Sequence, residues 1–146
     1  MRSGSEIVRI VLATAATVLG SAACGPVLQE NDDLLSGPWR VEAVELDGTT
    51  VGPGGRSMVL EFSTAESALR GNTGCHQIFG AFTFLDDGTA SFTIPGRSSE
   101  ACAPADQTAE DQLIDALEAV SSWTLAPDRS LEVRGPTASV TLTSEG

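Results

Sequence analysis

Apolar and polar residues alternate in short runs along most of the chain after residue 38. Alternation with a period of two predicts β-strands that bury one face. The dipeptide Asp47-Gly48 predicts a turn, and Asp86-Asp87-Gly88 lies between two alternating runs, as in a β-hairpin. Residues 52–55 predict a loop, and an irregularity is expected between Val41 and Val44. The expected strands are residues 39–46, 58–62, 68–72, 79–85, 90–94, 123–125, 130–133 and 139–142.

One segment, which starts at Thr108, has a period of about 3.6 and predicts a helix. Thr108 and Asp111 have the spacing of a capping box, and Ser121-Ser122 is expected to end the helix. The apolar face is formed by Leu113, Ile114, Leu117 and Val120. Glu110, Asp111, Asp115 and Glu118 are expected mostly off this face. The last three, Asp111, Asp115 and Glu118, form an acidic stripe that is expected to be solvated.

These elements define an α+β fold, with an antiparallel sheet that can curl toward a barrel and one α-helix packed on it. Aromatic residues are expected to supply much of the core, although Trp123 could instead lie on a binding surface. They are Trp39, Phe62, Phe79, Phe82, Phe84, Phe92 and Trp123.

The first 23 residues have the three parts of a secretory signal peptide. Arg2 and Arg9 precede the apolar run Ile10–Leu19, and small residues follow it up to Ala23. The apolar run is shorter than the roughly 17–25 residues of a membrane-spanning helix, so a retained anchor fits less well. Residues 24–34 are expected to form an acidic flexible tether, and residues 35–146 the folded domain.

Cys24 follows Ser21-Ala22-Ala23, which resembles a bacterial lipobox except that Ser21 stands where an aliphatic residue is usual. The interpretation is a lipid-anchored protein on the outer face of the cell membrane. Ordinary cleavage, which leaves a secreted protein with a free cysteine, is the alternative. Three cysteines leave one over after a pair forms, and acylation of Cys24 would use it.

The charge balance excludes some partners. The chain of 146 residues has eight basic and twenty acidic residues. Removal of Arg2, Arg9 and Glu6 with the leader leaves six arginines and nineteen acids, a formal charge of −13. Nucleic acid and anionic lipid are therefore not expected as electrostatic partners.

Cys75 and Cys102 are the best candidates for a disulfide, because cysteines of small exported domains usually pair. A redox-active pair usually has closer spacing, such as Cys-x-x-Cys. A thiol hydrolase that uses Cys75-His76 fits less well, because a disulfide would consume the thiol.

His76 is the only histidine, which leaves too few ligands for zinc. Asp86 does not begin a calcium loop, because the later ligand positions are apolar. No catalytic, cofactor or metal site is therefore expected.

Several motifs together resemble the META domain, the HslJ-like family of bacterial secreted proteins and lipoproteins. Leu35, Gly37 and Trp39 fit its L-x-G-x-W pattern, and residues 71–76 fit G-x-x-G-C-N with His76 in place of Asn. Further matches are Phe79-Gly80-Ala81-Phe82, Ala101-Cys102, a helix with Glu110, and the last strand pair.

The resemblance implies a small α+β unit, a pairing of the two cysteines, and no catalytic residue set. His76 puts in question a turn hydrogen bond that the usual Asn would make. The expected function is a non-enzymatic cell-envelope lipoprotein module with a binding, structural or stress-tolerance role. Its partners would be the membrane, through the lipid anchor, and an envelope protein or ligand. An envelope enzyme or inhibitor with an acidic surface site is the alternative.

Overall fold

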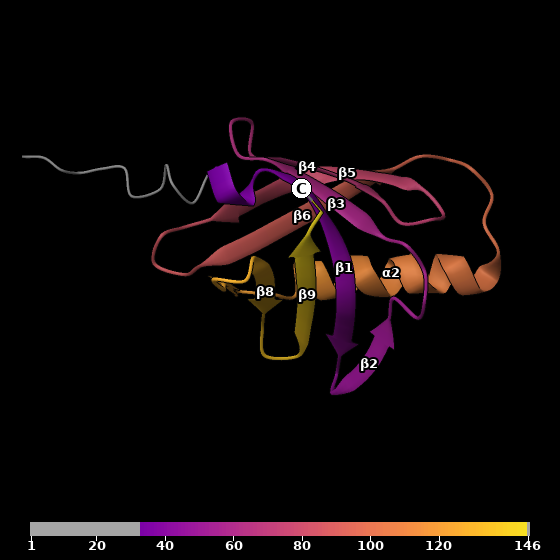
Figure 1. The fold of residues 1–146 in the computed structure, drawn as a ribbon. Coiled ribbons are helices and arrows are strands. Elements are labelled where there is room, and N and C mark those ends of the chain that lie inside the picture. Colours follow the sequence, from indigo (N-terminus) through magenta and orange to yellow (C-terminus); the bar gives the residue numbers. More distant parts are fainter. Residues whose placement is uncertain (1–32, 146) are drawn as a thin grey trace, which may run out of the picture.

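The computed structural model describes residues 33–145, so the predicted signal peptide, Cys24 and most of the predicted tether lie outside the described residues. Its nine strands and one long helix are arranged as an α+β fold, as predicted (Figure 1). The elements are β1 Gly37–Leu46, β2 Thr49–Gly52, β3 Val59–Ser63, β4 Ala68–Asn72, β5 Gln77–Phe84, β6 Ala90–Arg97, α2 Pro104–Glu118, β7 Ser122–Leu125, β8 Ser130–Arg134 and β9 Ala138–Ser144. None of the described helices is long and apolar enough to span a membrane.

All strands belong to one antiparallel sheet with the order β6-β5-β4-β3-β1-β9-β8-β7, and β2 pairs with β1 beside this path. The two ends of the sheet meet at one point. Thr89 forms a bridge with Ser122, and the Trp123 N–H donates to the Gly88 carbonyl at 3.0 Å. The sheet is therefore a curled half-barrel whose ends touch only where β6 begins.

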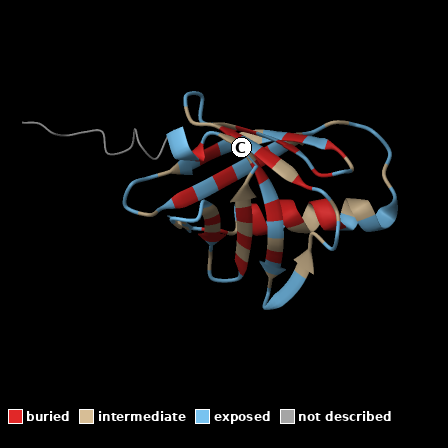
Figure 2. Ribbon diagram, in the orientation of Figure 1, coloured by how far each residue is buried: buried red, intermediate tan, exposed pale blue. Residues whose placement is uncertain are grey.

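The helix α2 packs on β6, β9, β1 and β2, and its buried face joins the core of the sheet (Figure 2). Burial alternates along β6 and β9, as the period-two pattern predicts. The irregularity predicted after Val41 is confirmed, because the pairing of β1 with β9 shifts between Val41 and Ala43. Strand alternation and an apolar helix face therefore account for one continuous core.

The prediction that Phe79 belongs to the core is wrong. Phe82 and Phe84 set the inward face of β5, and Phe79 has the opposite parity, so its side chain is 43% exposed. Ile78 takes the inward position and is fully buried. Strand β2 was not predicted, although the Asp47-Gly48 turn that leads into it was. Both turn residues have positive φ angles, 53° and 80°, as a tight hairpin requires.

The predicted start of the helix is also wrong. The helix α2 begins at Pro104, with Ala103 at the N-cap and no side-chain cap. Proline at the first position is preset for helical φ and needs no N–H partner there, so the helix starts one turn earlier than Thr108. The Thr108 hydroxyl donates to the Pro104 carbonyl at 3.0 Å, so Thr108 and Asp111 form no capping box.

Candidate functional site

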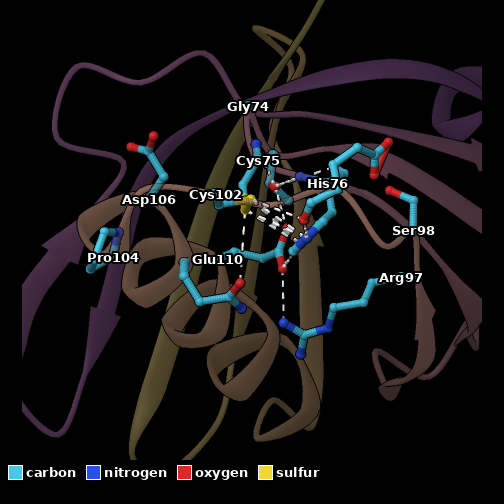
Figure 3. Close-up of a disulfide and its surroundings, with 12 residues drawn as sticks. Gly74, Cys75, His76, Arg97, Ser98, Cys102, Pro104, Asp106 and Glu110 are labelled. Atoms are coloured by element: carbon cyan, nitrogen blue, oxygen red, sulfur yellow. Dashed lines mark hydrogen bonds and ion pairs between the residues drawn. A yellow bond between two sulfur atoms is a disulfide. The ribbon is translucent and has the colours of Figure 1, made fainter.

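A disulfide joins Cys75, in the turn between β4 and β5, to Cys102, in the connection that leads into α2 (Figure 3). The two Cα atoms are 5.5 Å apart, a usual separation for a disulfide. The predicted pairing is confirmed. Because 27 residues of sequence separate the cysteines, the chain-entropy estimate of the stabilisation is about 3.5 kcal/mol.

His76 lies directly beneath this disulfide and is only 7% exposed. Its Nε2 is 2.6 Å from the Glu100 carbonyl oxygen, which can only accept, so Nε2 carries a hydrogen. Its Nδ1 is 2.8 Å from Oε1 of Glu110. With a carboxylate on that side, both ring nitrogens donate and the ring is an imidazolium. The bond to Glu110, followed by the bond to the Glu100 carbonyl, raises the pKa of His76 above its ordinary value.

Glu110 is the fully buried acid at the centre of this arrangement. Besides His76, its Oε1 accepts from Nη1 of Arg97 at 2.8 Å, and its Oε2 accepts from the Thr73 hydroxyl. The same Arg97 nitrogen lies 2.9 Å from Asp111, which raises the pKa of Arg97 and lowers the pKa of the Asp111 carboxyl. The buried carboxylate thus has two cationic partners and one hydroxyl donor, as buried charge requires. Cys75, His76, Arg97, Cys102 and Glu110 are called the disulfide cluster below.

The central role of Glu110 was not predicted, because Glu110 was expected with the acids that lie mostly off the apolar face of the helix. Glu110 precedes Leu113 by three residues and Ile114 by four, so it belongs to the apolar face of α2. A carboxylate at a core-facing position is a signal that it has buried partners. This spacing could have identified Glu110 before the structure.

The β4–β5 turn keeps its hydrogen bonds although His76 replaces the usual Asn. The Asn72 side chain accepts from the Gly74 N–H at 2.9 Å, and the Thr73 hydroxyl oxygen accepts from the N–H groups of Cys75 and His76. The His76 ring is therefore free to reach the β6–α2 connection through the Glu100 carbonyl.

Cys75, His76 and Cys102 bring three metal-ligand atoms within 4.8 Å of one another. Nδ1 of His76 is 3.3 Å from Sγ of Cys75, and Nε2 is 3.5 Å from Sγ of Cys102. Both sulfur atoms are used in the disulfide, and both ring nitrogens are hydrogen-bonded. In the oxidised protein these residues therefore offer neither a thiolate nucleophile nor a free metal ligand.

The other sequence-predicted candidates lie apart from the disulfide cluster. Asp86-Asp87-Gly88 forms the turn between β5 and β6, where Asp87 accepts from the Thr89 N–H at 2.9 Å. Within the predicted acidic stripe, Asp111 contacts Arg97, whereas Glu118 accepts from the backbone N–H of Ile94 at 2.8 Å, so these two acids do not converge. None of the four cavities found among the described residues is lined by two carboxylates.

The largest of these cavities is a surface groove of about 470 Å³ beside β7. Trp123 forms part of its wall, is half-buried, and packs against Phe84 with ring centroids 5.3 Å apart. Its indole N–H donates to the Leu85 carbonyl at 2.7 Å. Trp123 is thus both a support of the core and a groove residue. The Trp123 groove is lined by Leu34, Asp86, Gly88, Trp123, Thr124, Leu125, Ala126, Pro127 and Arg129.

The half-barrel, its long helix and the disulfide between the β4–β5 turn and the helix connection define a class of small, disulfide-linked α+β domain. The sequence profile of the META domain matches residues 32–145, and the chain belongs to this family. No functionally curated protein matches the chain.

Two solved structures share the fold. An NMR structure of a protein from Burkholderia xenovorans has a TM-score of 0.59 and 21% identity, over 90% of this chain and 97% of that one. A crystal structure of a DUF4847 family protein from Bacteroides vulgatus has a TM-score of 0.53 and 11% identity, over 75% of this chain and 93% of that one. At these identities the likeness shows the fold alone.

Proposed function

We propose that this META domain is a non-enzymatic module of the cell envelope. It is exported by residues 1–23, held at the outer face of the cell membrane by a lipid on Cys24, and binds an extended polypeptide segment in the Trp123 groove. The observation that carries the proposal is the contrast between the two sites. The residues capable of chemistry are paired with one another, and His76 and Glu110 among them are buried, whereas the groove is open and partly apolar.

Export is supported by the disulfide, because disulfides form and persist in oxidising compartments. The predicted lipid site is near the groove along the chain. Ten residues separate Cys24 from Leu34, which lies in the groove wall, so the groove stays within about 35 Å of the lipidated residue. A groove so close to the membrane fits a partner that is itself in the envelope.

The extended partner is inferred from the free edge of β7. The Trp123 N–H points away from β8, to the Gly88 carbonyl, whereas the Ala126 N–H donates to the carbonyl of Ser130, the first residue of β8. Alternation along the strand places the N–H and carbonyl of Leu125 on the same side as those of Trp123. No bond from the Leu125 N–H to another described residue closes this edge. A strand that adds here would use these groups and cover Trp123.

The alternative, an envelope enzyme or inhibitor with an acidic surface site, has less support. It requires two or more carboxylates that converge in a cavity. Asp111 and Glu118 of α2 contact different partners, and the Trp123 groove contains one carboxylate, Asp86, together with the cation Arg129.

The anchor is tested by expression of the full chain in a bacterial host and mass spectrometry of the membrane fraction. We expect a mature N-terminus at Cys24 that carries diacylglycerol, and loss of the protein from the membrane fraction for Cys24→Ala. An N-terminal Cys24 without lipid would overturn the anchor.

The groove is tested with a photoreactive amino acid at Thr124 in intact cells. We expect a defined crosslinked polypeptide that disappears with Leu125→Pro, which removes the outward N–H but no bond to β8. The same photoreactive residue at Glu61, on the exposed side of β3, is the matched control. Equal crosslinking from both positions, or no effect of Leu125→Pro, would contradict binding at the β7 edge.

A further inference from the structure

The surroundings of the disulfide differ from those of an inert structural crosslink. Both cysteine residues are partly exposed, and the His76 ring lies 3.3 Å from one sulfur and 3.5 Å from the other. A cation in contact with sulfur stabilises the thiolate over the thiol, and a thiolate is what leaves when a disulfide is attacked. The imidazolium of His76 therefore stabilises the products of reduction.

A second feature of the structure also stabilises a thiolate, in this case at Cys102. This residue directly precedes Ala103, the N-cap of α2, which has no side-chain cap. The positive end of the helix dipole therefore faces the Cys102 region. The carboxylate of Asp106, in the first turn, is offset by its ion pair with Arg56 at 2.7 Å.

We propose that the Cys75–Cys102 disulfide is exchange-active and that its substrate is a low-molecular-weight thiol. This reactivity goes beyond the binding role and requires no catalytic turnover. It gives the exported domain two covalent states, which differ in whether the β4–β5 turn is joined to the connection before α2.

The exchange proceeds in two balanced steps. A thiolate attacks Sγ of Cys102, a mixed disulfide forms, and the S–S electron pair leaves on Sγ of Cys75 beside Nδ1 of His76. A second thiolate attacks the sulfur of the bound thiol, and Cys102 leaves as a thiolate at the start of α2. In sum, two thiols are oxidised to one disulfide, the protein disulfide is reduced to two cysteines, and the two thiol protons pass to the cysteines or to solvent.

The charged groups around His76 preserve its imidazolium form. Glu110 from α2 contacts the ring directly, and Glu100 contributes its carbonyl from the β6–α2 connection. Arg97 from β6 shares the Glu110 carboxylate and is itself paired with Asp111. The bond to Glu110, followed by the bond to the Glu100 carbonyl, also raises the pKa of His76 above its ordinary value.

The test uses the mature exported protein with Cys24→Ala, so that Cys75 and Cys102 are its only cysteines. The disulfide is equilibrated with reduced and oxidised glutathione in the presence of a chelator. Replacement of His76→Asn, the residue usual at this position of the family motif, is expected to disfavour reduction at least tenfold. For a two-electron couple this corresponds to about 30 mV. Ser98→Ala removes contacts to the Gln77 N–H and to the Glu100 carboxylate but leaves the His76 ring and both cysteines in place, so it should shift the equilibrium much less.

A second measurement does not depend on the folding of a variant. Thiolate absorbance at 240 nm in the reduced protein is titrated against pH, and at least one cysteine is expected to have a pKa clearly below the free value of about 8.5. Two cysteines that titrate near this free value would overturn the proposal. An unchanged equilibrium in His76→Asn, or an equal shift in Ser98→Ala, would do the same.

Discussion

The two ends of α2 show two different uses of side chains. The disulfide cluster lies at the N-terminal end, and the Trp123 groove lies beyond the C-terminal end, about 22 Å away along a helix of 15 residues. At the first end, the fully buried Glu110 is paired with two cations. At the second end, apolar side chains such as Leu34 and Leu85 remain more than 40% exposed. Buried charge needs a fixed set of partners, whereas exposed apolar surface is available to a partner from outside.

The largest effect on the free energy of unfolding is expected from Glu110→Ala. The substitution leaves His76 and Arg97 without their shared carboxylate and removes the acceptor of the Thr73 hydroxyl. Loss of one partner from a buried ion pair destabilises a protein by about 3–5 kcal/mol. Urea unfolding of the oxidised protein should show this decrease in the free energy of unfolding.

Asp111→Ala is the matched control for this prediction. It removes a carboxylate that contacts the same Arg97 nitrogen, but the Asp111 side chain is 48% exposed. A surface ion pair contributes about 0–1 kcal/mol, so the loss should be much smaller. Equal losses in both variants would mean that the disulfide cluster is no more than a surface ion-pair network.

A smaller effect is expected from Trp123→Ala at the other end of the helix. The side chain is only half-buried, although it packs on Phe84 and donates to the Leu85 carbonyl. Full burial of a large apolar side chain contributes about 1.5–3 kcal/mol, so we expect this substitution to lower the free energy of unfolding by about 1–2 kcal/mol. The photo-crosslink from Thr124 should disappear while the protein remains folded by circular dichroism. A destabilisation as large as that of Glu110→Ala would make Trp123 a core residue rather than a groove residue.

The sequence is most informative where one local pattern determines the structure. Alternation identifies the strands of the half-barrel, and the Asp47-Gly48 turn is identified by residues that tolerate positive φ. Strand β2 has only four residues and pairs only with β1, so its own pattern is too short to predict it.

The disulfide cluster is harder to predict because its contacts are non-local. The cysteine pairing follows from cysteine count and compartment, but the contact of His76 with Glu110 joins residues 34 positions apart. Its only local signal is the helical spacing of Glu110 from Leu113 and Ile114. The Trp123 groove depends on where the ends of the sheet meet, which single-strand patterns do not specify.

The smallest effect, and the one that tests the charge on His76, is the pH dependence of stability. The bond to Glu110 raises the pKa of His76 in the folded state, so the folded protein binds the His76 proton more tightly than the unfolded chain does. The stabilisation is therefore fully present below the unfolded pKa of about 6.5 and is lost as pH rises through the higher folded pKa. The pKa of the Asp111 carboxyl is lowered by Arg97, so this group titrates in the acid range and leaves the window above pH 6.5 unaffected. Thermal unfolding between pH 6 and 9 should show a Tm that falls more steeply in the wild type than in His76→Asn. The terminal amine titrates in both proteins, so the curve of the variant is also the control for its contribution. Parallel curves would mean that His76 is neutral, which would remove the cation from beside the disulfide.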